Sequence, residues 1–204
     1  MSADVLIVRT GAANLASVVA GFERVGRSVQ VTDNAFAVRN AKRVVLPGVG
    51  AFAPVAERLG KNGLGEAIRF RVTEDLPTLA VCLGLHLLAE GSDEGMDTGG
   101  LGILEVRASR YPDSVVVPQL GWNSIAADSN CHLLSDGVAY FANSYRITDQ
   151  PPGWNVAWSS HGGQFVAAVE RGNVLGCQFH PELSGAWGER LITRWLACRS
   201  EPQC

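Results

Sequence analysis

The chain has 204 residues and a formal net charge of −3, with 47% hydrophobic and 18% charged residues. This balance excludes a disordered chain, and a slightly acidic protein has no long-range attraction for nucleic acid or for an anionic membrane, so neither is an expected partner. The N-terminal residues do not resemble a signal peptide and no apolar run approaches the roughly 20 residues of a membrane span, which predicts a cytoplasmic protein. No Pro-, Ser- or charge-rich linker interrupts the sequence, so we expect a single domain over 1–204.

The first half of the chain predicts strands that alternate with helices. Short β-branched runs end at glycine or proline, and the segments between them carry apolar residues at helical spacing. Parallel strands need such crossover helices. In chain order we expect a strand at 4–11, a helix at 14–26, strands at 28–33 and 41–52, a helical region at 53–74 broken at 60–65, a strand at 76–83 and a helix continuing through 86–91.

From Leu101 onward the pattern changes to short strands with frequent turns. These strands are expected within 102–108, 115–125, 137–147 and 155–179, before a C-terminal helix at 184–199. The predicted fold class is therefore α/β, with an open, twisted, mostly parallel sheet that carries helices on both faces. The C-terminal half extends this sheet as mixed, hairpin-rich structure.

One of the five cysteines has an unusual setting. Cys131, Cys177, Cys198 and Cys204 show no C-x-x-C pairing and no zinc-like spacing, so neither a disulfide nor a metal site is expected. Cys82 instead ends the apolar run "LPTLAVC" where a helical pattern begins. A tight strand-to-helix turn would expose its thiol at the carboxyl edge of the sheet, and the helix N-terminus would favour the thiolate. The alternative is a buried structural cysteine.

A cysteine nucleophile needs a base that a third group orients. Of the four histidines, His132 and His161 are expected in exposed loops, and His86 is either a helix residue or a pocket residue. His180 ends an apolar strand in "FHPE", where an extended backbone would place its ring and the Glu182 carboxylate on one side. These two residues are the predicted base and its orienting group; a solvated strand end is the alternative.

The segment "LPGVGAF" is a candidate oxyanion loop. Its glycines allow the backbone to turn and to present the N–H groups of Val49 and Gly50, and the N–H of Leu83 beside the nucleophile can join them. An ordinary Pro-Gly turn after a strand is the alternative.

Together, "LPGVGAF", "VCLGLHLLAEGSDEG", "GLGILEV", "VPQLGWN", "YFANSY" and "CQFHPELSG" resemble class I glutamine amidotransferases. Within that family the sequence is most similar to glutaminase subunits of imidazole glycerol phosphate synthases, and the resemblance covers nearly the whole chain. It implies a flavodoxin-like fold in which Cys82 attacks the amide carbon of L-glutamine, His180 shuttles the proton and Glu182 orients His180. No cofactor and no metal are implied.

The resemblance also implies a substrate pocket and a partner. Ammonia would pass to a (β/α)8-barrel cyclase subunit that makes imidazole glycerol phosphate in histidine biosynthesis. The substrate-binding positions, besides the oxyanion loop, are His86, Asn143, Ser144 and Tyr145. The positions expected at the partner interface are Asn14, Pro118, Gln119, Trp122, Asn123 and Tyr140, although Trp122 could equally pack in the core.

Some residues depart from the family pattern. His86 replaces a substrate-binding glutamine, Gln119 and Asn143 replace two histidines, and no acidic residue lies near Arg9. Because His86 is titratable, it is expected to alter glutamine affinity or its pH dependence. Two alternatives follow: a paralogue that feeds ammonia to another synthase, and a catalytically weak regulatory or scaffold subunit.

Overall fold

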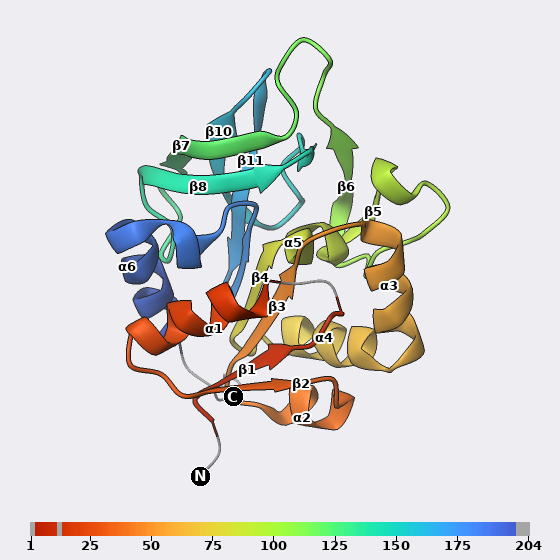
Figure 1. Cartoon of the computed structure of the whole chain (residues 1–204), viewed down its shortest axis with the longest axis vertical. Helices are drawn as coiled ribbons and strands as arrows, with labels where there is room; N and C mark the ends of the chain where they lie inside the picture. Colours follow the sequence, from red (N-terminus) through yellow and green to blue (C-terminus); the bar gives the residue numbers. More distant parts are fainter. Residues whose placement is uncertain (1–2, 12–13, 199–204) are drawn as a thin grey trace.

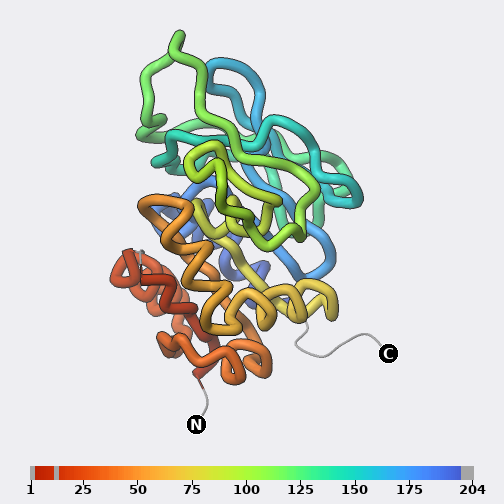
Figure 2. The backbone as a smooth tube through the Cα atoms, turned by 90° about the vertical axis from the view of Figure 1, so that its right-hand side faces the viewer, coloured from red at the N-terminus to blue at the C-terminus, as the bar shows by residue number. Residues whose placement is uncertain are grey.

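The computed structural model describes residues 3–11 and 14–198 (Figures 1 and 2). Cys204 and Arg199, the last residue of the expected C-terminal helix, lie outside the described residues. A nine-stranded sheet forms the centre of the fold. Its strands are β1 (Val5–Val8), β2 (Val29–Thr32), β3 (Val44–Gly48), β4 (Thr78–Cys82), β7 (Gln119–Ala127), β8 (Gly137–Asn143), β10 (Asn155–Ser160), β11 (Gln164–Arg171) and β12 (Val174–Cys177).

The sheet has a parallel part and an antiparallel part, in the order β2-β1-β3-β4-β12-β11-β10-β7-β8. The strands at the start of this order, β2, β1, β3, β4 and β12, run parallel to one another. From β12 to β8 every neighbouring pair is antiparallel, because these strands are joined by short turns rather than by helices. The alternating first half and the hairpin-rich second half of the sequence thus form the two parts of one mixed sheet, which agrees with the predicted α/β class.

Helices cover both faces of the sheet, as expected (Figure 1). On one face, α1 (Leu15–Arg24) and α6 (Gly185–Leu196) pack together through an edge-on contact of Phe22 with Trp195. The opposite face buries apolar side chains of the remaining helices. These are α2 (Ala35–Asn40), α3 (Phe52–Lys61), α4 (Leu64–Thr73) and α5 (Leu83–Leu88).

Several predicted elements differ from the structure. The helix expected through 86–91 ends at Leu88, and β5 (Ala89–Ser92) follows, because the next loop donates backbone hydrogen bonds to the carbonyls of Leu87, Leu88 and Ala89. With β6 (Leu104–Arg110) and β9 (Tyr145–Ile147), β5 forms a separate three-stranded sheet, so the expectation that the whole second half extends the main sheet is wrong. The short α2, capped by the Asn34 side chain, was not predicted.

Candidate active site

Three neighbouring parallel strands end at one edge of the main sheet and bring the predicted catalytic segments together. Strand β4 lies between β3 and β12, and in its pairing with β3 Cys82 lies opposite Gly48. Val49 therefore follows β3, Cys82 ends β4, and His180 follows β12. The carboxyl edge of such a sheet is where open α/β folds bind ligands.

Cys82 occupies a strained turn between β4 and α5. Its φ of 54° lies in the left-handed region, which a residue with a side chain rarely adopts. Gly84 makes this turn possible, since a Cβ atom there would lie 2.1 Å from the carbonyl oxygen of Leu46. The tight strand-to-helix turn predicted from the sequence is thus present, and it places the buried Cys82 thiol on the wall of a pocket.

His180 and Glu182 are joined through a short 3-10 turn, η2 (Pro181–Leu183). The Nδ1 atom of His180 lies 2.9 Å from Oε1 of Glu182. The two side chains therefore lie on one side, as expected. The expected extended backbone is present at His180 but not from Pro181 onward, because proline at the first helical position favours a helical turn. Main-chain contacts fix this segment: the N–H of His180 donates to the carbonyl of Tyr140, and Arg24 donates to the carbonyl of Glu182.

The charge state of His180 is set by its two neighbours. Burial alone would lower the pKa of this imidazole, but hydrogen bonds and charges of Cys82 and Glu182 outweigh it and raise the pKa to about 10. His180 therefore contacts the thiol on one side and the carboxylate on the other. It carries a proton at neutral pH, which is the form that can protonate a leaving group.

A pocket of about 530 Å³ opens above Cys82, a volume typical of small-molecule sites. Its lining includes Cys82 and His180, and Glu182 lies behind His180. The structure brings all the predicted oxyanion and substrate residues to this pocket, namely Val49, Gly50, Leu83, His86, Asn143, Ser144 and Tyr145.

The pocket contains a charged residue that the sequence interpretation missed. Glu94 lines the cavity, and its Oε2 accepts a hydrogen bond of 3.1 Å from the N–H of Phe52. Burial raises the pKa of this carboxyl group, while the Phe52 N–H opposes the shift. The signal in the sequence was the acidic pair after Ser92, but only the turn from α5 into β5 carries Glu94 back to the site.

His86 is neutral in this pocket. Burial lowers the pKa of its ring to about 4, although a hydrogen bond to Gln178 opposes the shift. The expectation that His86 alters glutamine affinity or its pH dependence stays a prediction, and the lowered pKa places any such titration on the acid side of neutrality.

Asn143 is held by a buried polar network. Its Nδ2 donates to the hydroxyl of Tyr111 at 3.0 Å and to the carbonyl of Tyr145 at 2.9 Å, and the Tyr111 hydroxyl donates to Gln119 at 2.6 Å. These contacts fix the orientation of the amide. Within the described part of the chain, Oδ1 of Asn143 has no hydrogen-bond partner, so this oxygen can accept a hydrogen bond from a ligand.

Most residues predicted for a partner interface are accessible. Asn14 and Pro118 are exposed, Trp122 is 60% exposed, and Asn123 and Tyr140 are partly exposed. Trp122 thus does not pack in the core; its ring meets Tyr140 edge-on across β7 and β8. The sixth predicted position, Gln119, is 6% exposed, because the network around Tyr111 holds its side chain inside.

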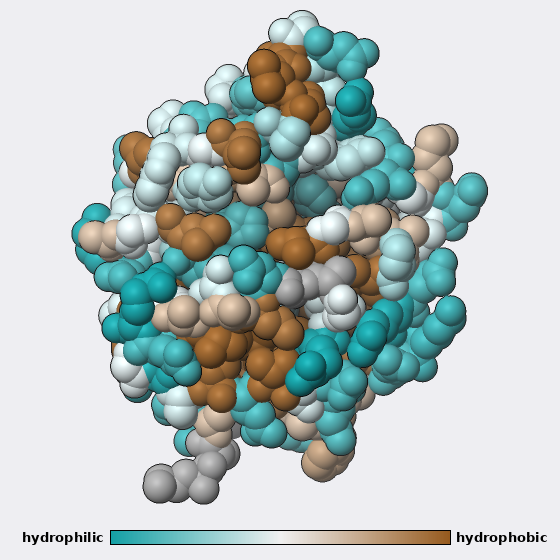
Figure 3. All heavy atoms as spheres, viewed as in Figure 1, coloured by the Kyte–Doolittle hydropathy of each residue, from teal (hydrophilic) through white to brown (hydrophobic). Residues whose placement is uncertain are grey.

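Apolar side chains gather on the same face of the molecule. Exposed large hydrophobic residues of this region are Leu120, Trp122, Val138 and Leu183, from β7, β8 and η2. In the space-filling view, apolar groups also lie over α1, below β7 and β8 (Figures 1 and 3). Such a patch is typical of a protein–protein contact.

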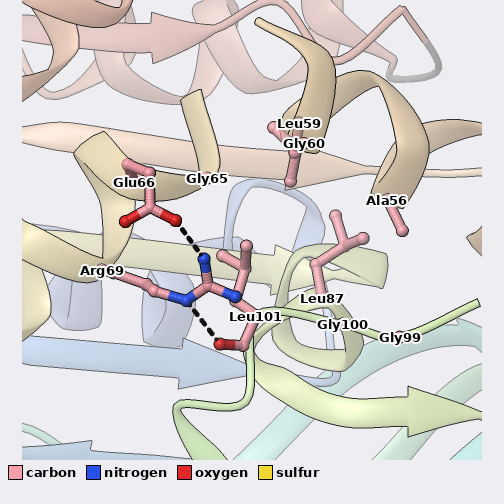
Figure 4. Close-up of a pocket in the computed structure, with 10 residues that line it drawn as sticks. All are labelled: Ala56, Leu59, Gly60, Gly65, Glu66, Arg69, Leu87, Gly99, Gly100 and Leu101. Carbon is pink, nitrogen blue, oxygen red and sulfur yellow. Dashed lines mark hydrogen bonds and ion pairs between the residues drawn. The ribbon is translucent and has the colours of Figure 1, made fainter. Parts of the chain in front are cut away.

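A second hollow lies away from this site, between α3, α4 and residues 99–101 (Figure 4). Its charged lining residues neutralise each other, since Arg69 pairs with Glu66 at 2.5 Å and also donates to the carbonyl of Leu101. The three other described thiols are also unsuited to reaction: burial raises the pKa of Cys131, Cys177 and Cys198. Over 3–11 and 14–198, no group of three His, Cys, Asp or Glu side chains could hold a metal ion.

Comparisons with known proteins place this chain in a family. The profile described as "Glutamine amidotransferase class-I" matches residues 6–196. The chain is 40% identical to "Imidazole glycerol phosphate synthase subunit HisH" of Symbiobacterium thermophilum, over 95% of this chain and 93% of that protein. It is 39% identical to the HisH subunit of Idiomarina loihiensis, with 95% and 97% coverage.

Solved structures share the fold. A structure described as "Crystal structure of glutamine amidotransferase" matches with a TM-score of 0.74 at 19% identity, over 94% of this chain and 96% of that one. None of the described helices has the length and apolar character needed to cross a membrane. The sequence profile and the relatives agree, and the chain belongs to the class I glutamine amidotransferase family.

Proposed function

We propose that this glutamine amidotransferase is the glutaminase subunit of an imidazole glycerol phosphate synthase and works in histidine biosynthesis. The observation that carries the glutaminase reaction is the position of His180, which contacts Cys82 and Glu182 at the floor of a pocket. The names of the relatives, at 34–40% identity over nearly the whole chain, support the assignment to this synthase.

In the proposed reaction, Cys82 and His180 form and break the covalent intermediate. The thiolate of Cys82 attacks the side-chain amide carbon of L-glutamine, a C–S bond forms, and the C–N bond breaks as the nitrogen takes the proton of His180 and leaves as ammonia. Water then attacks the thioester and gives a proton to His180, and the thiolate leaves to yield glutamate. Since Nδ1 of His180 faces Glu182, Nε2 is the nitrogen that moves protons.

The pocket supplies complementary groups for the rest of the substrate. We assign the backbone N–H groups of Val49, Gly50 and Leu83 to the developing oxyanion, because these residues flank Cys82. The Glu94 carboxylate offers a counter-charge for the α-ammonium group of glutamine. Ser144 and Tyr145, which also line the pocket, are the proposed contacts to the α-carboxylate.

The partner in this proposal is a barrel-fold cyclase subunit that consumes the ammonia. The apolar surface of β7, β8 and η2, with Asn14, Pro118, Trp122, Asn123 and Tyr140, is the proposed contact in a cytosolic heterodimer. A plant relative described as "Imidazole glycerol phosphate synthase hisHF, chloroplastic" supports the pairing: this chain matches 34% of its length, so the relative has a large additional region.

Glutamate release from L-glutamine tests the proposal. The chain alone should release glutamate slowly, and adding the cyclase with its nucleotide-type ligand should accelerate release. Cys82→Ser should abolish glutamine-dependent turnover and leave ammonia-dependent synthesis by the complex intact, whereas the buried control Cys177→Ser should retain both. Stimulation by another synthase but not by this cyclase would contradict the pathway, and turnover that survives in Cys82→Ser would contradict the nucleophile.

A further inference from the structure

A buried glutamine, Gln178, lies between the ring of His86 and the sulfur of Cys82. Gln178 lies between β12 and His180, and its side chain has no exposed surface. Its Oε1 lies 2.6 Å from Nε2 of His86, and its Nε2 lies 4.0 Å from Sγ of Cys82. The N–H of Gln178 donates to the carbonyl of Ala167 at 2.8 Å, which holds the backbone beneath the site.

The protonation of His86 determines which way this amide points. A neutral imidazole has one N–H, and a contact of Nε2 with an amide oxygen requires that the proton be on Nε2. The amide NH2 group of Gln178 then faces the sulfur. The reversed amide would turn its oxygen toward the sulfur, which a thiol S–H can tolerate but a thiolate repels.

We propose that Gln178 is a second hydrogen-bond donor to the thiolate of Cys82, and that His86 is a positioning residue that holds the Gln178 amide in the donating orientation. This inference rests on the proposed function of Cys82 as the nucleophile. The thiolate is then held between His180 and Gln178, so its charge and its direction of attack are fixed before substrate arrives.

This arrangement also gives a role to the departure of His86 from the family pattern. Its ring lines the pocket and reaches Gln178 at the same time. Because the ring is rigid and neutral, it orients the amide without adding a charge next to the nucleophile. Loss of the ring N–H would leave Gln178 free to rotate.

Other charged or titratable groups lie around Cys82 and must stay constant in a test. His180 and its partner Glu182 lie beyond the end of β12, Glu94 lines the same pocket, and Tyr111 lies directly after β6 and contacts Asn143. None of these groups is altered by a substitution at Gln178, so a change in the pH response can be assigned to the lost donor.

The test is the rate of iodoacetamide alkylation of Cys82 in the full chain as a function of pH, read by peptide mass spectrometry. Gln178→Met keeps an unbranched side chain of similar size and should move the pH midpoint upward by about one unit, which lowers the rate at the wild-type midpoint about fivefold. His86→Leu should move it in the same direction, and His86→Gln, which restores an N–H donor, should reverse that change. The control is Gln150→Met, a glutamine outside the pocket whose amide donates to the carbonyl of Trp154, and its midpoint should not move.

The outcomes separate this inference from the proposed function. An unchanged midpoint in Gln178→Met, with Cys82 still the reactive thiol, overturns the inference alone. A wild-type chain in which Cys82 reacts no faster than Cys131 overturns the proposed function. Nitrogen NMR of His86 in the unmodified chain gives an independent answer: a neutral ring with its proton on Nε2 from pH 5 to pH 9 supports the inference, and a proton on Nδ1 overturns it.

Discussion

Replacing His86 by glutamine should flatten the acid dependence of the free energy of unfolding. Burial lowers the pKa of His86 from 6.5 to about 4, so between these pH values the unfolded chain binds a proton that the folded chain does not. The free energy of unfolding of the wild type therefore decreases when the pH is lowered through this window. A difference of 2.5 pKa units corresponds to about 3 kcal/mol at 1.36 kcal/mol per unit.

Urea unfolding monitored by tryptophan fluorescence at a series of pH values from 7 to 4.5 measures this slope. Over that range, acidification should lower the free energy of unfolding of the wild type by about 2 to 3 kcal/mol relative to that of His86→Gln. His180 does not interfere, because its raised pKa gives stability that is complete below pH 6.5 and is lost only as the pH rises toward 10. The exposed control His132→Gln should leave the slope unchanged. Parallel pH profiles for wild type and His86→Gln would refute the reasoning, since His86 would then titrate normally in the folded protein.

Three further substitutions test the elbow, the polar network and the partner surface. Gly84→Ala should destabilise the fold by about 3 kcal/mol in urea unfolding, because the added Cβ would lie 2.1 Å from a backbone oxygen. The control Gly60→Ala has open space around it and should be neutral or stabilising, so equal effects of the two substitutions would refute the steric argument. Tyr111→Phe leaves two buried amides short of a partner and should cost about 1 to 3 kcal/mol and raise the KM for glutamine, and an unchanged KM would contradict the role of the network. Trp122→Ala should weaken binding of the cyclase about thirtyfold in calorimetry with little effect on folding. The control Phe36→Ala, which removes an even more exposed side chain on α2, should not weaken it, and equal affinities of the wild type and Trp122→Ala would argue against the proposed surface.

Local sequence patterns were sufficient to predict those parts of the structure that depend on residues close together in the sequence. The β-branched runs predicted the strands β1 to β4, and the glycine two positions after Cys82 indicated a tight turn. The sequence also indicated Cys82 and His180 as the ends of two strands, whereas their meeting at one edge of the sheet depends on the pairing of β4 with β12. These features follow from periodicity and from glycine and proline geometry.

Features that depend on distant contacts could not be predicted from the sequence. The end of α5 at Leu88 is set by hydrogen bonds from the loop that returns over it, and that change brings Glu94 to the pocket. Gln178 resembles any strand residue until β12 is placed beside β4, and only then does its amide meet His86. The burial of Gln119 likewise depends on Tyr111, a residue that no local pattern singled out.

Covalent labelling tests the central claim of this account most directly. The chain, in complex with its cyclase, is treated with a diazo-ketone analogue of glutamine, and the modified peptide is identified by mass spectrometry. We predict a single adduct on Cys82, and excess L-glutamine should protect against it. Labelling of Cys131 or Cys177 with Cys82 left unmodified would contradict the assignment of the nucleophile.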